Sequence, residues 1–213
     1  LDITALIRAR GYHYCGFTTR EIETLINSSD VGEVTELYAR KEEELRRETI
    51  QKQLQMECLE EFRRLTENAE EQLFQISRRQ RPALYRFEFI RDGVLILGED
   101  REKVFRTWVR STPMVFLSQM NSWEKLVRGE TQVTAALGIF AEDAGKLGLD
   151  TAYAGYYEAC PCLYTVVREQ GNRFCPPMCL AHVVEYVRKH KIRVTGDPIA
   201  RTFLSMNKRE DYT

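Results

Sequence analysis

The stretch that decides the fold is residues 31 to 73, VGEVTELYARKEEELRRETIQKQLQMECLEEFRRLTENAEEQL, with no proline and a single glycine, Gly32. It is rich in Glu, Arg, Gln and Leu, which are strong helix formers. We therefore predict one continuous helix, far longer than the mean of about 11 or 12 residues. A helix of this length cannot be buried within one small domain.

One side of this predicted helix is apolar, whereas residues 40 to 48 are almost entirely charged. The apolar side consists of Val34, Leu37, Tyr38, Leu45, Ile50, Leu54, Cys58, Leu59, Phe62 and Leu65. This pattern favours an imperfect coiled-coil seam against a second copy of the chain, so we predict a homodimer. The alternative is a solvated helix that braces two domains of one monomer.

The composition of the whole chain is that of an ordinary water-soluble protein. Of its 213 residues, 43% are hydrophobic and 30% are charged, and the net charge of −1 gives no sign of a polyanion partner. No apolar run approaches the roughly 18 residues of a membrane helix, and no signal peptide opens the sequence. We expect a cytoplasmic protein with no membrane partner, whose six cysteines are thiols or metal ligands rather than disulfides.

Two shorter helices are predicted before the long one. Residues 1–14 carry the first, and residues 15–17 form a turn. Thr18-Thr19-Arg20-Glu21 then fits a capping box, in which a hydroxyl and a carboxylate bond the free amides at a helix start. The second helix follows with an apolar face of Ile22, Leu25 and Ile26.

After residue 76 the hydrophobic period changes from helical to alternating. Residues 77–82, SRRQRP, are predicted to form a basic linker that a proline ends. Asp92-Gly93 is a strong hairpin turn between two strands. The elements predicted before residue 150 are strands at 85–89, 94–97, 115–120 and 132–140 and a helix at 100–110.

The pattern repeats in the last third of the chain. Pro176 and Pro177 open a predicted helix whose residues 180, 183, 184 and 187 form an apolar core face. Extended segments are predicted at 153–158, 163–168 and 199–206. We therefore expect an α+β fold with an antiparallel sheet of two strand-helix-strand-strand units. Its last strand is expected after Thr213, unless the repeat is incomplete.

The N-terminal series resembles a known family. LIRARGYHYCGFTTREIETLI, residues 6–26, is similar to the segment of MerR-family transcription regulators in which an arginine-bearing helix, a Gly-Phe turn and a capped helix precede the dimer coiled coil. The resemblance implies remnant helices of a DNA-binding domain at 1–30, a coiled coil at 31–76, a linker at 77–82 and an effector domain at 83–213. Most of the winged-helix head is expected to precede residue 1.

The C-terminal part resembles the GyrI-like effector-binding domain of the multidrug-sensing MerR branch. The similar segments are RPALYRFEFIRDGVLI (81–96), DTAYAGYYEACPCLYTVVRE (150–169) and HVVEYVRKHKIRVTGDPIARTFL (182–204). The resemblance implies a homodimer that binds a small aromatic or hydrophobic effector and distorts promoter DNA, acting on RNA polymerase indirectly. It implies no cofactor.

A curved sheet covered on one side leaves a concave apolar face, where aromatic rings can stack on a flat ligand. The alternative is that these rings fill the core. The candidate ligand-binding residues are Phe87, Phe89, Phe140, Tyr157, Tyr164, Phe203 and Glu158. Drug-sensing relatives carry an acid in the pocket where this sequence has Ala200, so Glu158 or Glu169 would have to replace it.

Four cysteines support an alternative, a thiol- or metal-responsive regulator. Cys160 and Cys162 point the same way if their segment is extended, and Cys175 precedes a helix start, which lowers a thiol pKa. With Cys179, the four sulfurs could converge on a soft metal such as zinc. Otherwise all four are small buried apolar residues, and no metal is bound.

Catalytic motifs are scarce. The chain has only three histidines, and it lacks a glycine-rich phosphate loop, a Ser or Cys nucleophile motif and HExxH. We therefore predict that the protein is not an enzyme. The alternative, by resemblance, is a GyrI-like small-molecule hydrolase that uses a Tyr and a Glu in one cleft.

Overall fold

The computed structural model describes residues 3–130, 132–168 and 177–204. Its chain divides into two compact units, Leu1–Gln53 and Leu54–Thr213, which we call the helical unit and the sheet unit. The predicted α+β class is confirmed, since a long helix is present and the sheets are antiparallel. Among the described residues, every helix is too short or too polar to cross a membrane.

The helical unit contains two short helices and the first part of the long one, all at the predicted places. These are α1 (Ile3–Tyr14), α2 (Thr19–Asn27) and α3 (Val31–Glu67). The predicted capping box is confirmed, because the Thr18 hydroxyl accepts from the Glu21 amide and the Glu21 carboxylate accepts from the Thr18 amide. Phe17, Leu25 and Leu37 form the buried core of this unit.

The long helix α3 is continuous but shorter than predicted. It ends at Glu67 and is followed by a single turn, α4 (Ala69–Gln72), so the prediction of one helix to residue 73 was wrong at its C-terminal end. Leu54 and Cys58, on the part of α3 within the sheet unit, are buried, and the Cys58 thiol donates to the Pro113 carbonyl at 3.6 Å. That end of α3 therefore packs against its own chain.

The sheet unit is built on an antiparallel sheet of long and short strands in the order β3-β2-β5-β4-β8, with β6 also paired to β2. Its strands are β2 (Leu84–Arg91), β3 (Val94–Leu95), β4 (Phe116–Asn121), β5 (Val133–Phe140), β6 (Gly155–Tyr157) and β8 (Ile199–Arg201). The predicted hairpin turn is confirmed, because Asp92 and Gly93 both have positive φ between β2 and β3.

The prediction of an irregular linker at residues 77–82 was wrong. Ser77–Arg81 is strand β1, and it pairs antiparallel with β7 (Cys160–Tyr164) in a separate two-stranded sheet. The strand predicted at 163–168 thus lies at residues 160–164. After Tyr164, Val166 forms an isolated β-bridge to Leu73. Backbone pairing with a strand some eighty residues later overrides the local composition of β1.

Helices α5 (Glu99–Arg110) and α7 (Ala141–Leu147) supply side chains to the core on one face of the sheet. That core contains Phe87, Trp108, Val115, Leu137, Ile139 and Ala144. The predicted helix at 100–110 is confirmed, whereas α7 was not predicted. The Trp108 indole is fully buried and donates to the Asp150 carbonyl at 2.8 Å, which satisfies its one polar atom.

The remaining helices are α6 (Trp123–Val127), the 3-10 turn η1 (Pro177–Leu180) and α8 (Ala181–Lys189). The loop expected around Trp123 thus contains one helical turn. Val184 and Val187 on α8 are buried, as the predicted core face requires. The strand expected at 199–206 is β8, which ends at Arg201, so the prediction was too long over residues 202–204; residues 205 and 206 lie outside the described residues.

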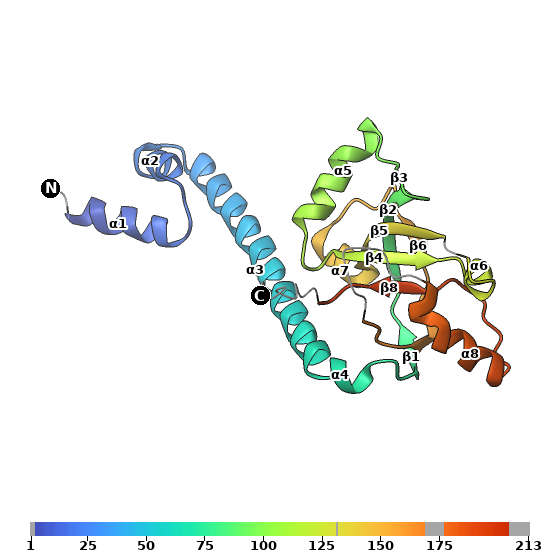
Figure 1. Ribbon diagram of the computed structural model, residues 1–213. Helices are drawn as coiled ribbons and strands as arrows, with labels where there is room; N and C mark the ends of the chain where they lie inside the picture. Colours follow the sequence, from blue (N-terminus) through green and yellow to red (C-terminus); the bar gives the residue numbers. More distant parts are fainter. Residues whose placement is uncertain (1–2, 131, 169–176, 205–213) are drawn as a thin grey trace, which may run out of the picture. The chain divides into compact units, whose positions relative to one another are not determined.

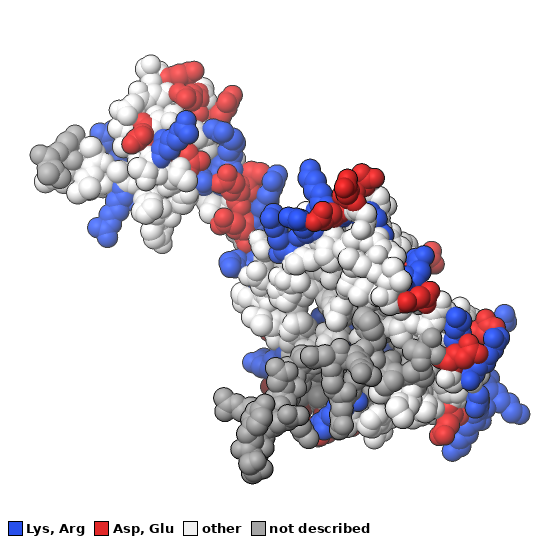
Figure 2. Space-filling view, turned by 45° about the horizontal axis from the view of Figure 1, so that its top comes forward, with Lys and Arg blue, Asp and Glu red and all other residues white. Residues whose placement is uncertain are grey.

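On the face drawn in Figure 2, the basic and acidic side chains of the described residues are intermixed rather than gathered in one basic patch. This distribution agrees with the net charge of −1. What this face can bind therefore depends on the residues of individual sites and not on an overall excess of charge.

Gly138 in β5 provides a test of the packing, because a Cβ there would lie 2.5 Å from the buried Phe116 ring. We expect Gly138→Ala to lower the free energy of unfolding by about 1–3 kcal/mol, because the ring must move within a packed sheet. Gly145→Ala in α7 is the matched control, since no atom lies within 4 Å of its added Cβ. It should raise stability by about 0.5–1 kcal/mol through helix propensity. Urea denaturation measures both, and equal effects would contradict this packing.

Candidate functional site

The candidate site lies at an interrupted edge of strand β2. One edge of β2 pairs along its length with β5, but the other edge is shared by two short strands. There, β3 pairs with residues 90 and 91, and β6 pairs with residues 84 to 86. Between them, residues 87 to 89 belong to neither ladder, and the register of β2 shifts at the same place. The Phe89 carbonyl still accepts from the Ile96 amide at 2.9 Å, so the gap between β3 and β6 is short.

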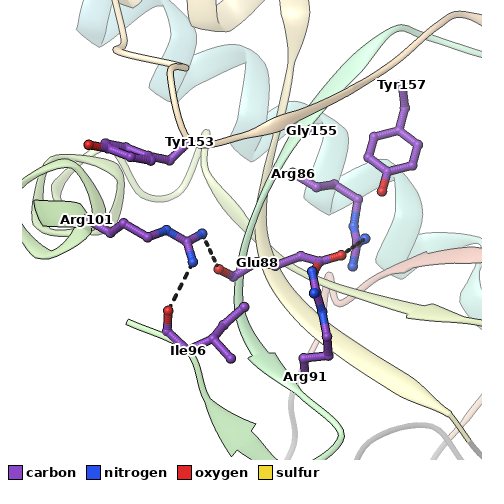
Figure 3. Close-up of a pocket in the computed structure, with 8 residues that line it drawn as sticks. All are labelled: Arg86, Glu88, Arg91, Ile96, Arg101, Tyr153, Gly155 and Tyr157. Carbon is purple, nitrogen blue, oxygen red and sulfur yellow. Dashed lines mark hydrogen bonds and ion pairs between the residues drawn. The ribbon is translucent and has the colours of Figure 1, made fainter. Parts of the chain in front are cut away.

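Arg101 of α5 fills this gap with its guanidinium group. Its Nη2 donates to the Glu88 carbonyl at 2.8 Å, and its Nη1 donates to the Ile96 carbonyl at 3.0 Å (Figure 3). The guanidinium carbon lies 4.7 Å from the ring centroid of Phe87 and 6.0 Å from that of Tyr153. The Arg101 side chain thus supplies hydrogen-bond donors to the carbonyls of Glu88 and Ile96, as a neighbouring strand would do elsewhere in the sheet.

Glu88 and two further arginines lie beside the gap. The Glu88 carboxylate is 17% exposed and lies 2.5 Å from Arg91 Nη2 and 3.7 Å from Arg86 Nη1. The Arg86 side chain is fully buried, and its Nε donates to the Ser118 hydroxyl at 3.0 Å. Its guanidinium carbon lies 5.7 Å from the Tyr157 ring centroid. Burial of a charged side chain is tolerated here because its donors are paired.

Together these residues surround an open pocket of about 230 Å³. It is lined by Arg86, Glu88, Arg91, Ile96, Arg101, Tyr153, Gly155 and Tyr157 (Figure 3). Its volume is below the roughly 300–1,000 Å³ of pockets for drug-sized ligands but above the ~150 Å³ cavity that holds a benzene molecule. The pocket therefore suits a compound with one ring and a small polar group.

Of the predicted ligand-binding residues, Tyr157 lines this pocket. Phe87 is 0% exposed in the core, so it offers no surface to a ligand. Phe89 packs against the same core. The Phe140 ring packs against Phe116 in a tilted arrangement, with the centroids 5.4 Å apart, on the sheet side opposite that core. For Phe87 and Phe89 the structure thus favours the alternative of core packing.

The other predicted residues lie elsewhere in the sheet unit. Tyr164 lies under the Arg79 guanidinium at 3.6 Å, and Phe203 is half-buried. The Glu158 side chain is exposed, and its carbonyl accepts from Arg81 Nη2 at 2.7 Å. Ala200, the expected position of a pocket acid, is an exposed residue of β8. Glu169 lies outside the described residues.

The sheet face opposite the core is not the purely apolar surface that was expected. Besides Arg86, it carries Arg201 of β8, which bonds Glu61 of α3 at 2.8 Å and lies 4.7 Å from the Phe116 ring centroid. From the sequence, no role was predicted for the arginines of β2. The only signal for the site was that Arg86 and Glu88 share one face of β2, which places opposite charges side by side.

The cysteines do not form a metal site within the part of the chain that the structure describes, where no group of three or more metal-binding side chains occurs. Cys160, Cys162 and Cys179 are half-buried free thiols, and Cys175 lies outside the described residues. Burial, reinforced by the neighbouring Cys160, raises the pKa of the Cys162 thiol. A raised pKa disfavours the thiolate that metal binding and redox sensing require.

The pocket also contains the residue types that the hydrolase alternative expects, Tyr157 and Glu88. The Glu88 carboxylate is paired with two guanidinium groups. The hydrolase alternative remains an untested prediction.

No protein-family model matches this chain, and no curated protein matches it significantly. The geometry of the site therefore carries the functional argument.

Arg101 should contribute to stability through its two backbone bonds. We expect Arg101→Met to lower the free energy of unfolding by about 1–3 kcal/mol, because two carbonyl acceptors lose a charged donor. Arg106→Met, on an exposed part of the same helix, should change it by less than about 0.5 kcal/mol. Urea denaturation of both variants checks this. Equal stabilities of the two would show that the gap in β2 does not need Arg101.

Proposed function

We propose that this chain is part of a dimeric, ligand-responsive transcription regulator of the MerR type, whose sheet unit binds a small aromatic effector. The observation that carries the proposal is the ring-sized pocket between Tyr153 and Tyr157, in a unit compact in its own right. Two tyrosines offer π-faces and hydroxyl groups, which orient a flat polar compound. In this proposal the bound compound triggers the response, and the helical unit belongs to the part of the protein that acts on DNA.

The order of the helices supports the regulator class. An arginine-bearing α1, a Gly-Phe turn, a capped α2 and the long α3 follow one another as the resemblance implies. In such a regulator α1 and α2 belong to a winged-helix head that contacts promoter DNA. The head then reads and distorts DNA shape, so that RNA polymerase can engage the promoter.

Exposed apolar side chains on α3 support the homodimer. Val31, Tyr38 and Leu45 recur every seven residues and are 78%, 43% and 42% exposed. A heptad spacing keeps such residues on one side of a helix, where a second α3 would cover them. The proposed dimer thus buries side chains that one copy of the chain leaves in water.

The sheet unit also contains a route from the pocket to α3. Arg86 bonds Ser118 of β4, and Ser118 is paired in register with Arg201 of β8. Arg201 in turn bonds Glu61 on α3. In our proposal, occupancy of the pocket alters the Arg86 end of this chain of contacts and α3 transmits the change. The proposal also takes β2, β3, α5, β4 and β5 as the first of two GyrI-like repeats.

The dimer can be tested by sedimentation equilibrium with one substitution on α3. We expect the unmodified chain to be a dimer, and Leu45→Glu to weaken dimerisation by roughly tenfold or more, because a charge would have to be buried in the seam. Gln51→Glu introduces the same charge on a different side of α3 and should leave the dimer intact. A monomer at the highest attainable concentration would overturn the dimer.

The effector site can be tested by thermal unfolding with single-ring aromatic compounds. A compound that binds the folded state stabilises it by about 2.7 kcal/mol at 100 times its Kd, which raises Tm. We expect this shift to be lost in Tyr157→Leu. The shift should be retained in Tyr156→Leu, since the Tyr156 ring packs at a tilt against Tyr85, with the centroids 5.1 Å apart, and does not line the pocket. An equal shift in both variants would place the effector elsewhere.

A further inference from the structure

The charged groups that line the pocket are unequal in number. Arg86, Arg91 and Arg101 each contribute one positive charge, and Glu88 contributes the only negative charge among the lining residues. Among the lining residues, positive charges thus exceed negative ones by two, and Asp92, which is not a lining residue, attracts Arg91 and offsets part of this excess. In a concave site with low-dielectric walls, such an excess attracts an anion and repels a cation.

The hydrogen bonds of the two most enclosed arginines do not cancel their charge. Arg86 donates to the Ser118 and Thr134 hydroxyls and to the Met120 sulfur, all of which are neutral. Arg101 donates to two backbone carbonyls, and its Nε is buried without a hydrogen-bond partner. Glu88 is therefore the only acid among the lining residues, and Arg86 and Arg91 share its carboxylate, while Arg91 is also attracted by Asp92 outside the lining.

The rest of the lining determines the shape of the ligand. Tyr153 and Tyr157 present aromatic rings, Ile96 adds an apolar side chain, and the volume of about 230 Å³ admits one ring. Tyrosine rings also stabilise the adjacent guanidinium groups, which keeps the cations at the pocket wall. A ring that stacks on tyrosine and carries one negative group fits both features at once.

We infer that the pocket at the interrupted edge of β2 selects a monocyclic aromatic carboxylate. The inference rests on the proposed function only in taking this pocket as the effector site. It differs from the resemblance, in which a pocket acid would attract a cation, and this sequence has Ala200 at that acid's expected position. The carboxylate would compete with Glu88 for Arg91, which is exposed, whereas the fully buried Arg86 would act on it only through its charge. A charge-assisted bond to a guanidinium group is among the strongest available.

Isothermal titration calorimetry of the whole chain with three probes of similar shape tests the charge preference. The probes are benzoate, neutral benzamide and benzylammonium. We expect benzoate to bind roughly tenfold more tightly than benzamide, and benzylammonium to bind more weakly than both. The affinity for benzoate should also fall as salt concentration rises, because mobile ions screen the arginines.

Two variants with opposite expected signs separate ligand contact from a structural role. Glu88→Gln removes the competing carboxylate and should tighten benzoate binding several-fold, whereas Arg91→Gln should weaken it by roughly tenfold. Arg91 is 59% exposed, so its loss should not disturb folding, and Arg91→Lys should retain most of the affinity. Arg106→Gln, on α5 but outside the pocket, is the control and should change nothing.

The outcomes distinguish this inference from the proposed function. Benzamide or benzylammonium binding as tightly as benzoate would overturn the anion preference and leave an aromatic effector site standing. A loss of benzoate affinity in both Glu88→Gln and Arg91→Gln would show that the ion pair only holds the pocket in shape, which also overturns it. Failure of all three probes to bind would remove the pocket as an effector site.

Discussion

The sheet unit depends on how one edge of β2 is covered where strand pairing is interrupted and an arginine side chain bonds the backbone on both sides of the gap. The strands β3 and β6 cover the two ends of that edge, and Arg101 donates to the carbonyls of Glu88 and Ile96 between them. The Arg101 side chain occupies less space than a strand would, so the pocket remains open beside it. Its guanidinium group also places a positive charge at the pocket wall.

The alternation of side chains along β2 assigns its two faces to different roles. Phe87 and its neighbours two residues away face α5 and α7 and form the core, whereas Arg86 and Glu88 face the opposite side. Arg86 is tolerated at full burial because Ser118, Thr134 and Met120 accept its hydrogen bonds. The core thus fixes β2 in place, and β2 in turn fixes the charged residues of the site.

Arg201 shows how the same sheet face reaches the long helix. It bonds Glu61 and lies against the rings of Phe62 and Phe116, so β8 and the C-terminal part of α3 are held together within the sheet unit. Such contacts explain why Leu54 and Cys58 on this part of α3 are buried against the chain itself rather than in a coiled-coil seam. They also place an ion pair between the sheet and the helix that, in our proposal, carries the signal.

Local signals in the sequence were sufficient for much of the fold. The Thr18–Glu21 capping box, the Asp92-Gly93 turn and the apolar period of α5 and α8 each act within a few residues, so their structures could be predicted. Strand β1 could not, because its stability comes from pairing with β7 far along the chain. Tyr157 was predicted, but the arginines of the site were not, since the break in the edge of β2 is a property of the assembled sheet.

The central claim is the position of the ligand, and a crystal soaked with 4-bromobenzoate tests it most directly. The anomalous signal of bromine locates the ring independently of any interpretation of the protein density. We expect a single strong bromine peak in the pocket beside Tyr153 and Tyr157, with the carboxylate toward Arg91. A strong peak beside Tyr164 or Phe140 instead, or no peak at a concentration that saturates the protein in solution, would contradict the account.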